Sequence, residues 1–179
     1  MPVNAQYLPI LKETTHIVTI DPSARKSGGG CGLACFSMDS KYILPLQTKL
    51  VECQLENFDQ RCLAIARTVW MFVQHVLTSV VGCSRLSVFI ERPMYFVNSR
   101  KSLNISESGD LFKLTVAYAR IFERIHGNGV TTYNLEINHW KGQLSKNMIK
   151  RRIEHITSQK YKLDINDAVG MGLYLKGKF

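Results

Sequence analysis

The sequence has no run of apolar residues long enough to span a bilayer. Its first residues, Met1 to Tyr7, do not combine a basic start with a long apolar stretch, as a secretion signal would. Internal repeats and low-complexity tracts are also absent. We therefore expect no membrane span and no repeat architecture, but one domain, for which 179 residues provide a sufficient core.

Cysteine is present but is not arranged for zinc or for a disulfide framework. The residues are odd in number and include no Cys-x-x-Cys pair: Cys31, Cys35, Cys53, Cys62 and Cys83. This spacing does not suit a zinc ribbon or finger. Free thiols indicate a reducing compartment, and we expect the cytoplasm.

Acidic residues are scarce relative to basic ones. The chain has 14 Asp and Glu against 23 Lys and Arg, a net charge of +9 and a pI of about 9.4. This excess favours a polyanionic partner, nucleic acid before a membrane surface, although general solubility would also account for the charge. The glycines at 28–30 are not followed by Gly-Lys-Ser/Thr, so a nucleotide phosphate loop is rejected.

The apolar pattern predicts the element order β-β-β-α-β-α-β-α-α. Strands are expected at residues 16–20, 31–38, 41–51, 86–90 and 130–135, and helices at about 57–81, 108–126, 145–159 and from 164 onward. This order indicates an α/β fold with a mixed five-stranded sheet, an antiparallel meander followed by parallel strands, and helices on both faces. Residues 1–14 are expected to form a flexible extension to a single domain of residues 15–179.

Four acidic residues stand in distinctive contexts. Asp21 closes the first predicted strand and Glu91 closes the fourth, so both would lie at the same end of the sheet if these strands are parallel neighbours. Asp164 and Asp167 are three residues apart and would share one side of a helix N-terminus. Buried carboxylates are costly unless a positive charge meets them, and clusters of them are typical ligands of hard divalent cations.

Each of these acids also has a purely structural interpretation. Asp21 precedes a proline and could be a turn residue, and Glu91 could pair with Arg92. Asp164 could cap the last helix, and Asp167 could be an acidic residue of its first turn that interacts favourably with the helix dipole. Together these interpretations require unrelated coincidences in one topological order, so we favour a shared metal site.

Basic and aromatic residues are interleaved in two segments. The loop after the fourth strand mixes apolar, aromatic and basic residues, among them Arg92, Tyr95, Phe96, Arg100 and Lys101. Such a mixture can stack on exposed bases while it holds phosphates. In the second segment, Lys146 and Lys150 share a helix face, and the helix that begins after Ser145 could offer backbone N–H groups to a phosphate. The alternatives are a solvated basic face and an aromatic residue packed under the loop.

The ordered set of motifs is similar to that of RuvC-type Holliday-junction resolvases of the RNase H-like superfamily, in a phage-encoded or otherwise divergent form. The motifs span about residues 17–175: Val18–Ser23, Ile90–Pro93, Tyr133–Leu135 with Lys141 and Lys146 downstream, and Asp164–Ala168. The long glycine-rich turn after Asp21 and the extended segment after Tyr133 depart from the family pattern. These departures leave substrate preference more open than the fold.

The resemblance implies a metal-dependent endonuclease that resolves four-way DNA junctions in the cytoplasm of a bacterium or of a phage-infected host. Asp21 would bridge two Mg²⁺ or Mn²⁺ ions, and Glu91, Asp164 and Asp167 would complete their shells, with Lys141 as a further catalytic residue. The products would carry 5′-phosphate and 3′-hydroxyl ends, and the enzyme would act as a homodimer. An aromatic residue shortly after Glu91 would enter the centre of the junction. The residues expected at the DNA are Arg92, Tyr95, Phe96, Arg100, Lys101, Lys141, Lys146, Lys150 and Arg151.

Other functions remain open. The same carboxylates would serve another RNase H-like nuclease acting on RNA–DNA hybrids or on branched replication intermediates. A non-catalytic junction-binding module would be favoured by the loss of an acid, but all four are present. An actin-like ATPase can also end its first strand in Asp, but this chain lacks room for a second lobe.

Overall fold

The structure is a computed structural model that describes residues 2–25, 30–39, 41–79, 85–94 and 109–179. Cys83 lies outside these residues, and within them Cys31, Cys35, Cys53 and Cys62 form no disulfide. Within the described ranges, no helix has the length and apolar character needed to cross a membrane.

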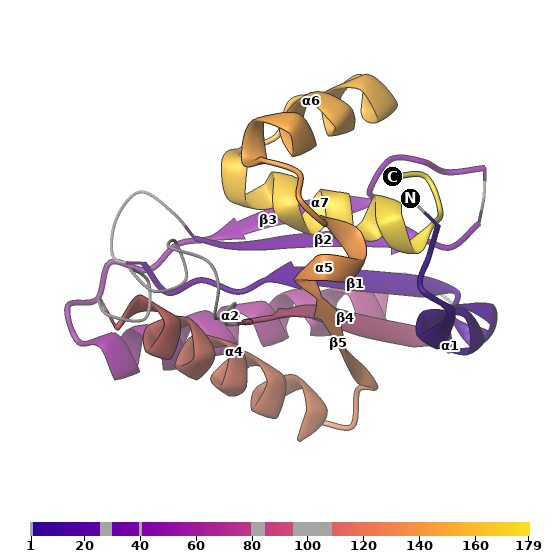
Figure 1. The fold of residues 1–179 in the computed structure, drawn as a ribbon. Coiled ribbons are helices and arrows are strands. Elements are labelled where there is room, and N and C mark those ends of the chain that lie inside the picture. The colour runs from indigo at the N-terminus through magenta and orange to yellow at the C-terminus, as the bar shows by residue number, and fades with distance from the viewer. Residues whose placement is uncertain (1, 26–29, 40, 80–84, 95–108) are drawn as a thin grey trace.

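A five-stranded sheet forms the centre of the molecule (Figure 1). Its strands are β1 (His16–Asp21), β2 (Cys31–Ser37), β3 (Gln47–Val51), β4 (Leu86–Arg92) and β5 (Thr132–Glu136). Their order is β3-β2-β1-β4-β5, with antiparallel pairing from β3 to β1 and parallel pairing from β1 to β5. The predicted meander followed by parallel strands is therefore confirmed, with β1 in the middle and paired on both sides.

Helices α2 (Phe58–Ser79) and α4 (Asp110–His126) cover one face of the sheet (Figure 1). Successive side chains of a strand project to opposite faces, so alternate residues of each strand point toward these helices. Val18 and Ile20 of β1 are fully buried in one apolar cluster with Ile65 of α2 and Ile121 of α4. This apolar cluster packs the central strand β1 against α2 and α4.

Helix α7 (Leu163–Leu175) covers the opposite face and is buried along its length from Ile165 to Leu175. It lies between the sheet and α6 (Lys146–Thr157), so it presents no face to solvent (Figure 1). Gly172 permits this close packing, because a Cβ there would lie 2.0 Å from the ring of Phe36 on β2. The prediction of helices on both faces is confirmed.

The N-terminal segment differs from the expected flexible extension. It forms a 3₁₀ turn, η1 (Ala5–Tyr7), followed by α1 (Leu8–Glu13). Tyr7 is only 2% exposed, in the same apolar cluster as the residues of α7. The backbone N–H of Asn4 donates to the Tyr174 hydroxyl at 2.7 Å. A single buried aromatic residue anchors a segment that has no helical or strand periodicity of its own.

The third strand begins at Gln47 and not at Lys41 as predicted. Pro45 has no N–H to donate, and the N–H of the next residue, Leu46, donates to the carbonyl oxygen of Cys35 on β2 at 2.7 Å, where the pairing begins. The residues that were expected to pair are instead exposed, with Tyr42 at 57%. A further helix of one turn, α5 (Ile137–Trp140), lies between β5 and α6 and was not predicted.

Candidate functional site

Asp21 and Glu91 lie next to each other at one end of the sheet. Asp21 ends β1, and Glu91 stands one residue before the end of β4. The two strands are parallel, with Ile20 paired to Ile90, so the acids follow on adjacent strands. Neighbouring strands are separated by about 4.8 Å, which brings the two carboxylates within strong electrostatic reach. The predicted parallel pairing that this proximity requires is confirmed.

Burial and mutual repulsion raise the pKa values of both carboxyls. Burial raises the pKa of Asp21 well above its ordinary value, and the charges of Glu91 and Asp167 raise it further. Burial raises the pKa of Glu91 to about 7 against the opposing charge of Lys141, and Asp167 adds to the rise. A bound cation would stabilise the charged forms of these carboxylates strongly, because they are buried and repel one another.

Asp167, on the first turns of α7, is the third member of this electrostatic group. It is 4% exposed, and its Oδ2 lies 3.3 Å from Nζ of Lys141 and 3.7 Å from Nζ of Lys146. The two ammonium groups come from either side of the turn that joins α5 to α6. The structure therefore brings Lys141 and Lys146 to the acids.

A glycine allows Asp164 to approach the end of β1. Gly32 of β2 pairs with Asp21, and a Cβ at Gly32 would lie 2.0 Å from the backbone oxygen of Asp164. The Asp164 side chain accepts a hydrogen bond from the backbone N–H of Gly30 at 3.0 Å. Its alternative role as a helix cap is wrong, because the N-cap of α7 is Lys162 and Asp164 lies within the first turn.

Glu91 has Trp140 as its hydrogen-bond partner. The indole Nε1–H of Trp140, at the end of α5, donates to Oε2 of Glu91 at 2.9 Å. Arg92 is the next residue of the strand and projects to the other face. There its charge opposes the rise that burial causes in the pKa of Tyr118 on α4. The explanation of Glu91 as the partner of Arg92 therefore does not hold.

The other predicted DNA-binding residues lie apart from the acids or outside the described chain. Nζ of Lys150 is 3.9 Å from Oε1 of Glu154 on the exposed surface of α6, and Arg151 is exposed beside it. Ser145 caps α6 as predicted, because its hydroxyl accepts the N–H of Met148 at 3.3 Å. Four predicted residues fall outside the described ranges: Tyr95, Phe96, Arg100 and Lys101.

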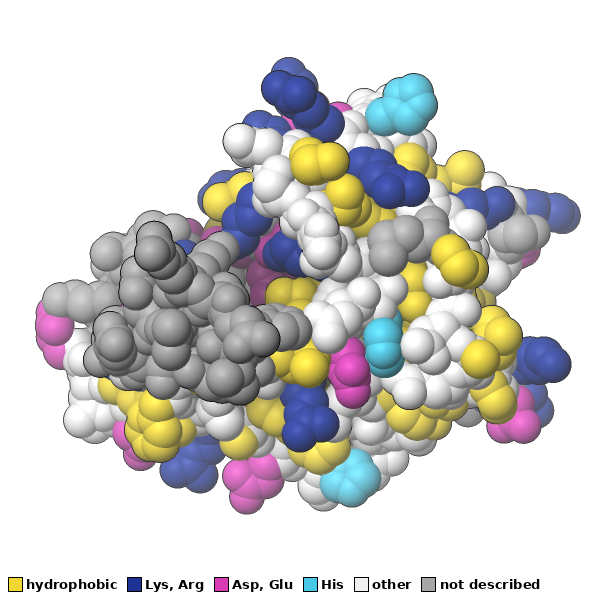
Figure 2. Space-filling model, viewed as in Figure 1, with side chains coloured by type: hydrophobic (Ala, Val, Ile, Leu, Met, Phe, Trp, Pro, Cys, Tyr) yellow, Lys and Arg dark blue, Asp and Glu magenta, His cyan; other side chains and the backbone are white. Residues whose placement is uncertain are grey.

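The surface over this end of the sheet is hollowed. Figure 2 shows acidic side chains at the bottom of a hollow, with Lys and Arg side chains next to them on the side of α6. A strand of nucleic acid that entered this hollow would meet cations at its rim and carboxylates at its floor. This arrangement suits a phosphate that is neutralised partly by lysine and partly by a bound cation.

The donor set fits magnesium or manganese chemically, since four carboxylates supply only hard oxygen ligands. Across the part of the chain that the structure describes, no group of three or more His, Cys, Asp or Glu side chains is arranged to hold a metal ion as it stands. The oxygens are engaged elsewhere: Asp167 with two lysines, Asp164 with a backbone N–H and Glu91 with an indole. A cation would therefore compete with these partners, and the lysines would have to move off Asp167.

Sequence reasoning missed Trp140 and the glycines beside the acids. Trp140 directly precedes Lys141 in the basic segment, but nothing local indicates that its indole reaches a residue 49 positions earlier. Gly32 interrupts an otherwise apolar strand, and an isolated glycine in a strand is a signal of close backbone approach. That signal could have identified the point where α7 meets β2.

No protein-family model matches this sequence, and no curated protein matches it either. The fold does match solved structures. The Thermus thermophilus RuvC structure aligns with a TM-score of 0.61 and 16% identity over 89% of this chain and 92% of that one. T. thermophilus RuvC in complex with a Holliday junction substrate aligns with a TM-score of 0.62 and 15% identity, over 89% of this chain and 91% of that one. The chain thus has an RNase H-like fold that resembles RuvC over most of its length, as its motifs predicted.

Proposed function

We propose that this protein is a metal-dependent, structure-selective endonuclease that resolves four-way DNA junctions. The observation that carries the proposal is the meeting of Asp21, Glu91 and Asp167 at the end of the parallel strands, with Lys141 and Lys146 beside them. Burial raises the pKa values of Asp21 and Glu91 together, which disfavours their charged forms in the metal-free protein. Such groups are concentrated at functional sites.

In this proposal the carboxylates of Asp21, Glu91, Asp164 and Asp167 would hold two Mg²⁺ or Mn²⁺ ions. When bound, these ions would activate water and stabilise the leaving oxygen of an in-line displacement at phosphorus. Lys141 would neutralise the phosphate next to Asp167, and Lys146 would hold the adjoining backbone. The products would carry 5′-phosphate and 3′-hydroxyl ends, without a covalent enzyme intermediate.

Branched DNA is the proposed substrate. One of the solved structures with this fold contains RuvC with a Holliday junction, and the net charge of +9 favours a polyanion. The remaining predicted contacts that lie within the described residues, Arg92, Lys150 and Arg151, would bind the arms of the junction. A homodimer would cut two matched strands. The described cysteines form no disulfide, which fits action in the cytoplasm.

The second candidate is an RNase H-like nuclease acting on RNA–DNA hybrids, since the same carboxylates would serve it. The discriminating experiment measures cleavage of a synthetic four-way junction, a fork, a duplex and a hybrid, each in Mg²⁺, Mn²⁺ and EDTA, with Asp21→Asn as the inactive control. Junction cleavage in Mg²⁺ or Mn²⁺ and none in EDTA supports the proposal. Preferential cutting of the hybrid supports the second candidate, and binding without cutting under all conditions indicates a junction-binding module.

A further inference from the structure

Trp140 lies between two of the residues proposed to act in cleavage. Its Nε1–H donates to Oε2 of Glu91 at 2.9 Å, and Nζ of Lys141 lies 5.3 Å from its ring centroid. We propose that Trp140 is a positioning residue, which holds Glu91 by one oxygen so that the other is presented to a metal ion. This inference rests on the proposed function, because it assigns a role toward the same carboxylate.

The indole is itself fixed on several sides. Trp140 is fully buried. Gly170 of α7 leaves space for it, since a Cβ at Gly170 would lie 2.7 Å from Cζ3 of the ring. The ring of Phe179 packs at a centroid distance of 6.0 Å. Because the indole is fixed, its N–H favours one orientation of the Glu91 carboxylate. Residues that hydrogen-bond to metal ligands commonly orient them in this way.

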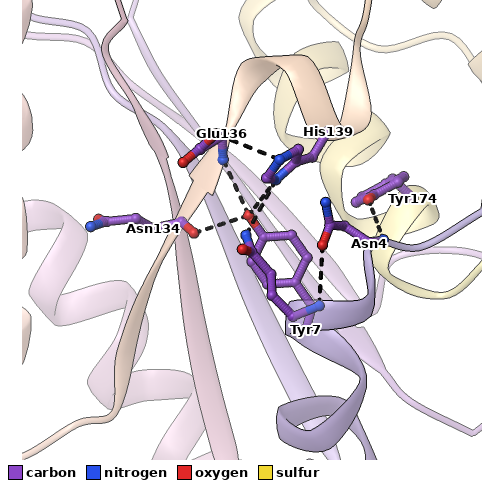
Figure 3. Close-up of polar contacts among 7 residues, drawn as sticks. Asn4, Tyr7, Asn134, Glu136, His139 and Tyr174 are labelled. Carbon is purple, nitrogen blue, oxygen red and sulfur yellow. Dashed lines mark hydrogen bonds and ion pairs between the residues drawn. The ribbon is translucent and has the colours of Figure 1, made fainter.

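The short helix that carries Trp140 is in turn held by the N-terminal segment (Figure 3). A helix of one turn is not stable alone. The hydroxyl of Tyr7 lies 3.0 Å from Nδ1 of His139, donates to the carbonyl oxygen of Asn134 at 3.3 Å and accepts the N–H of Glu136 at 3.4 Å. Nε2 of His139 lies 3.5 Å from Oε2 of Glu136. The Tyr7 hydroxyl thus contacts both the end of β5 and the short helix α5 that follows it.

These contacts form a continuous path from the N-terminal segment to the site. Tyr7 fixes the start of α5, α5 fixes the direction of Trp140, and Trp140 fixes Glu91. The alternative is that Trp140 is only a core residue whose N–H happens to be satisfied by the nearest oxygen. The two interpretations differ in what the loss of the indole N–H does to metal binding.

The decisive variant is Trp140→Phe, which keeps an aromatic ring but removes the donor. Trp70→Phe on α2 is the matched control, because it removes the other indole of the chain from a place remote from the acids. We expect Trp140→Phe to raise the Mg²⁺ concentration for half-maximal junction cleavage by about tenfold or more, with junction binding in EDTA unchanged and Trp70→Phe like wild type. An unchanged Mg²⁺ dependence in folded Trp140→Phe would overturn the proposal.

A second measurement needs no change at Trp140. In Trp70→Phe, the single remaining indole ¹H–¹⁵N signal belongs to Trp140, and it can be followed by NMR as Mg²⁺ is added to the protein without DNA. We expect a saturable shift of this signal that is lost in Glu91→Gln. A signal that does not move at Mg²⁺ concentrations sufficient for full cleavage would contradict the positioning role, even if Trp140→Phe failed to fold.

Tyr7→Phe tests the rest of the path, with Tyr42→Phe as the control at an exposed tyrosine. We expect a smaller rise in the Mg²⁺ requirement for Tyr7→Phe, about threefold, and none for Tyr42→Phe. Equal behaviour of the two variants would remove the N-terminal segment from the proposal. If wild type cuts no substrate in either metal, the proposed function fails, whereas the NMR titration still decides whether Trp140 senses a cation at Glu91.

Discussion

Nζ of Lys141 lies 3.3 Å from Oδ2 of Asp167, and the two side chains are only 13% and 6% exposed. Lys146 reaches the same oxygen at 3.7 Å and is 41% exposed. One carboxylate oxygen thus faces two ammonium groups, while Asp21 and Glu91 stand close by with raised pKa values. In the metal-free protein the lysines supply the positive charge that the acids require.

Lys141→Ala should therefore affect cleavage more than folding. Lys146 remains on the same oxygen, so we expect the free energy of unfolding to fall by only about 1 kcal/mol. Cleavage of a junction should slow by about tenfold or more. Single-turnover assays and urea unfolding measure the two effects, with Lys113→Ala, in an exposed pair with Asp110, as the control. Wild-type turnover at every salt concentration would remove Lys141 from the catalytic group.

Asp21→Asn should abolish cleavage and preserve junction binding. The amide cannot supply the charge that holds a cation, and we expect a loss of about a thousandfold or more. The fold should survive, because the substitution removes a buried charge that is repelled by Glu91 and Asp167. Asp110→Asn at an exposed position is the control. Gel-shift assays in EDTA and cleavage assays in Mg²⁺ measure the two properties, and cleavage at the wild-type rate would refute the assignment.

Glu91 should make the metal-free protein less stable as the pH rises. Its pKa is raised from 4.5 to about 7 in the folded state, so between these values the folded protein holds a proton that the unfolded chain releases. Stability is therefore lost with rising pH across this window, and the loss is complete above about pH 7. Glu91→Gln should remove it and be more stable than wild type at pH 8 by on the order of 2 kcal/mol, but not at pH 4.

Urea unfolding in EDTA at several pH values checks this prediction. Asp21 contributes a slope of the same sign, and this slope becomes smaller in Glu91→Gln because the charge of Glu91 no longer raises the pKa of Asp21. The difference between the two proteins therefore reports Glu91 together with its effect on Asp21. A stability difference that is the same at pH 4 and pH 8 would show that Glu91 does not titrate abnormally. Saturating Mg²⁺ should weaken the effect, because cation binding favours the charged carboxylate.

Gly32→Ala should disturb the site through the backbone. The added methyl group would lie 2.0 Å from the Asp164 carbonyl oxygen, so β2 and the start of α7 must separate. We expect the free energy of unfolding to fall by about 3 kcal/mol and cleavage to fall further than stability alone explains. Gly129→Ala is the control. It has a φ of +81° but nothing within 4 Å of the added Cβ, so it should cost about 1 kcal/mol and leave cleavage unchanged.

The strand order, the two covered faces and the positions of Asp21 and Glu91 could be predicted from the sequence because they follow from local rules. Alternation and apolar runs define β1 and β4, and short links define the meander. Asn57 stands at the predicted start of the helix at about 57–81 and accepts the N–H of Gln60 at 3.0 Å, which caps α2. Ser145 does the same for α6.

The remaining features depend on contacts between distant parts of the chain. The anchoring of the N-terminal segment rests on Tyr7 meeting Asn134 and His139, more than 120 residues away. The partner of Glu91 is a tryptophan on a helix of one turn, which has too few residues to show a period. Local propensity contains no information about such pairs. The sequence pattern alone could therefore neither correct the prediction of a flexible N-terminal extension nor reveal the contact between Trp140 and Glu91.

The layered position of α6 has a consequence for how the protein responds to heat. Asp21 and Glu91 belong to the central strands, whereas Lys146 begins a helix that lies on the far side of α7 from the sheet (Figure 1). Outer layers open at lower free energy than doubly paired strands. Warming should therefore detach Lys146 from Asp167 before the sheet comes apart. Cleavage would then be lost reversibly several degrees below the melting transition seen by circular dichroism.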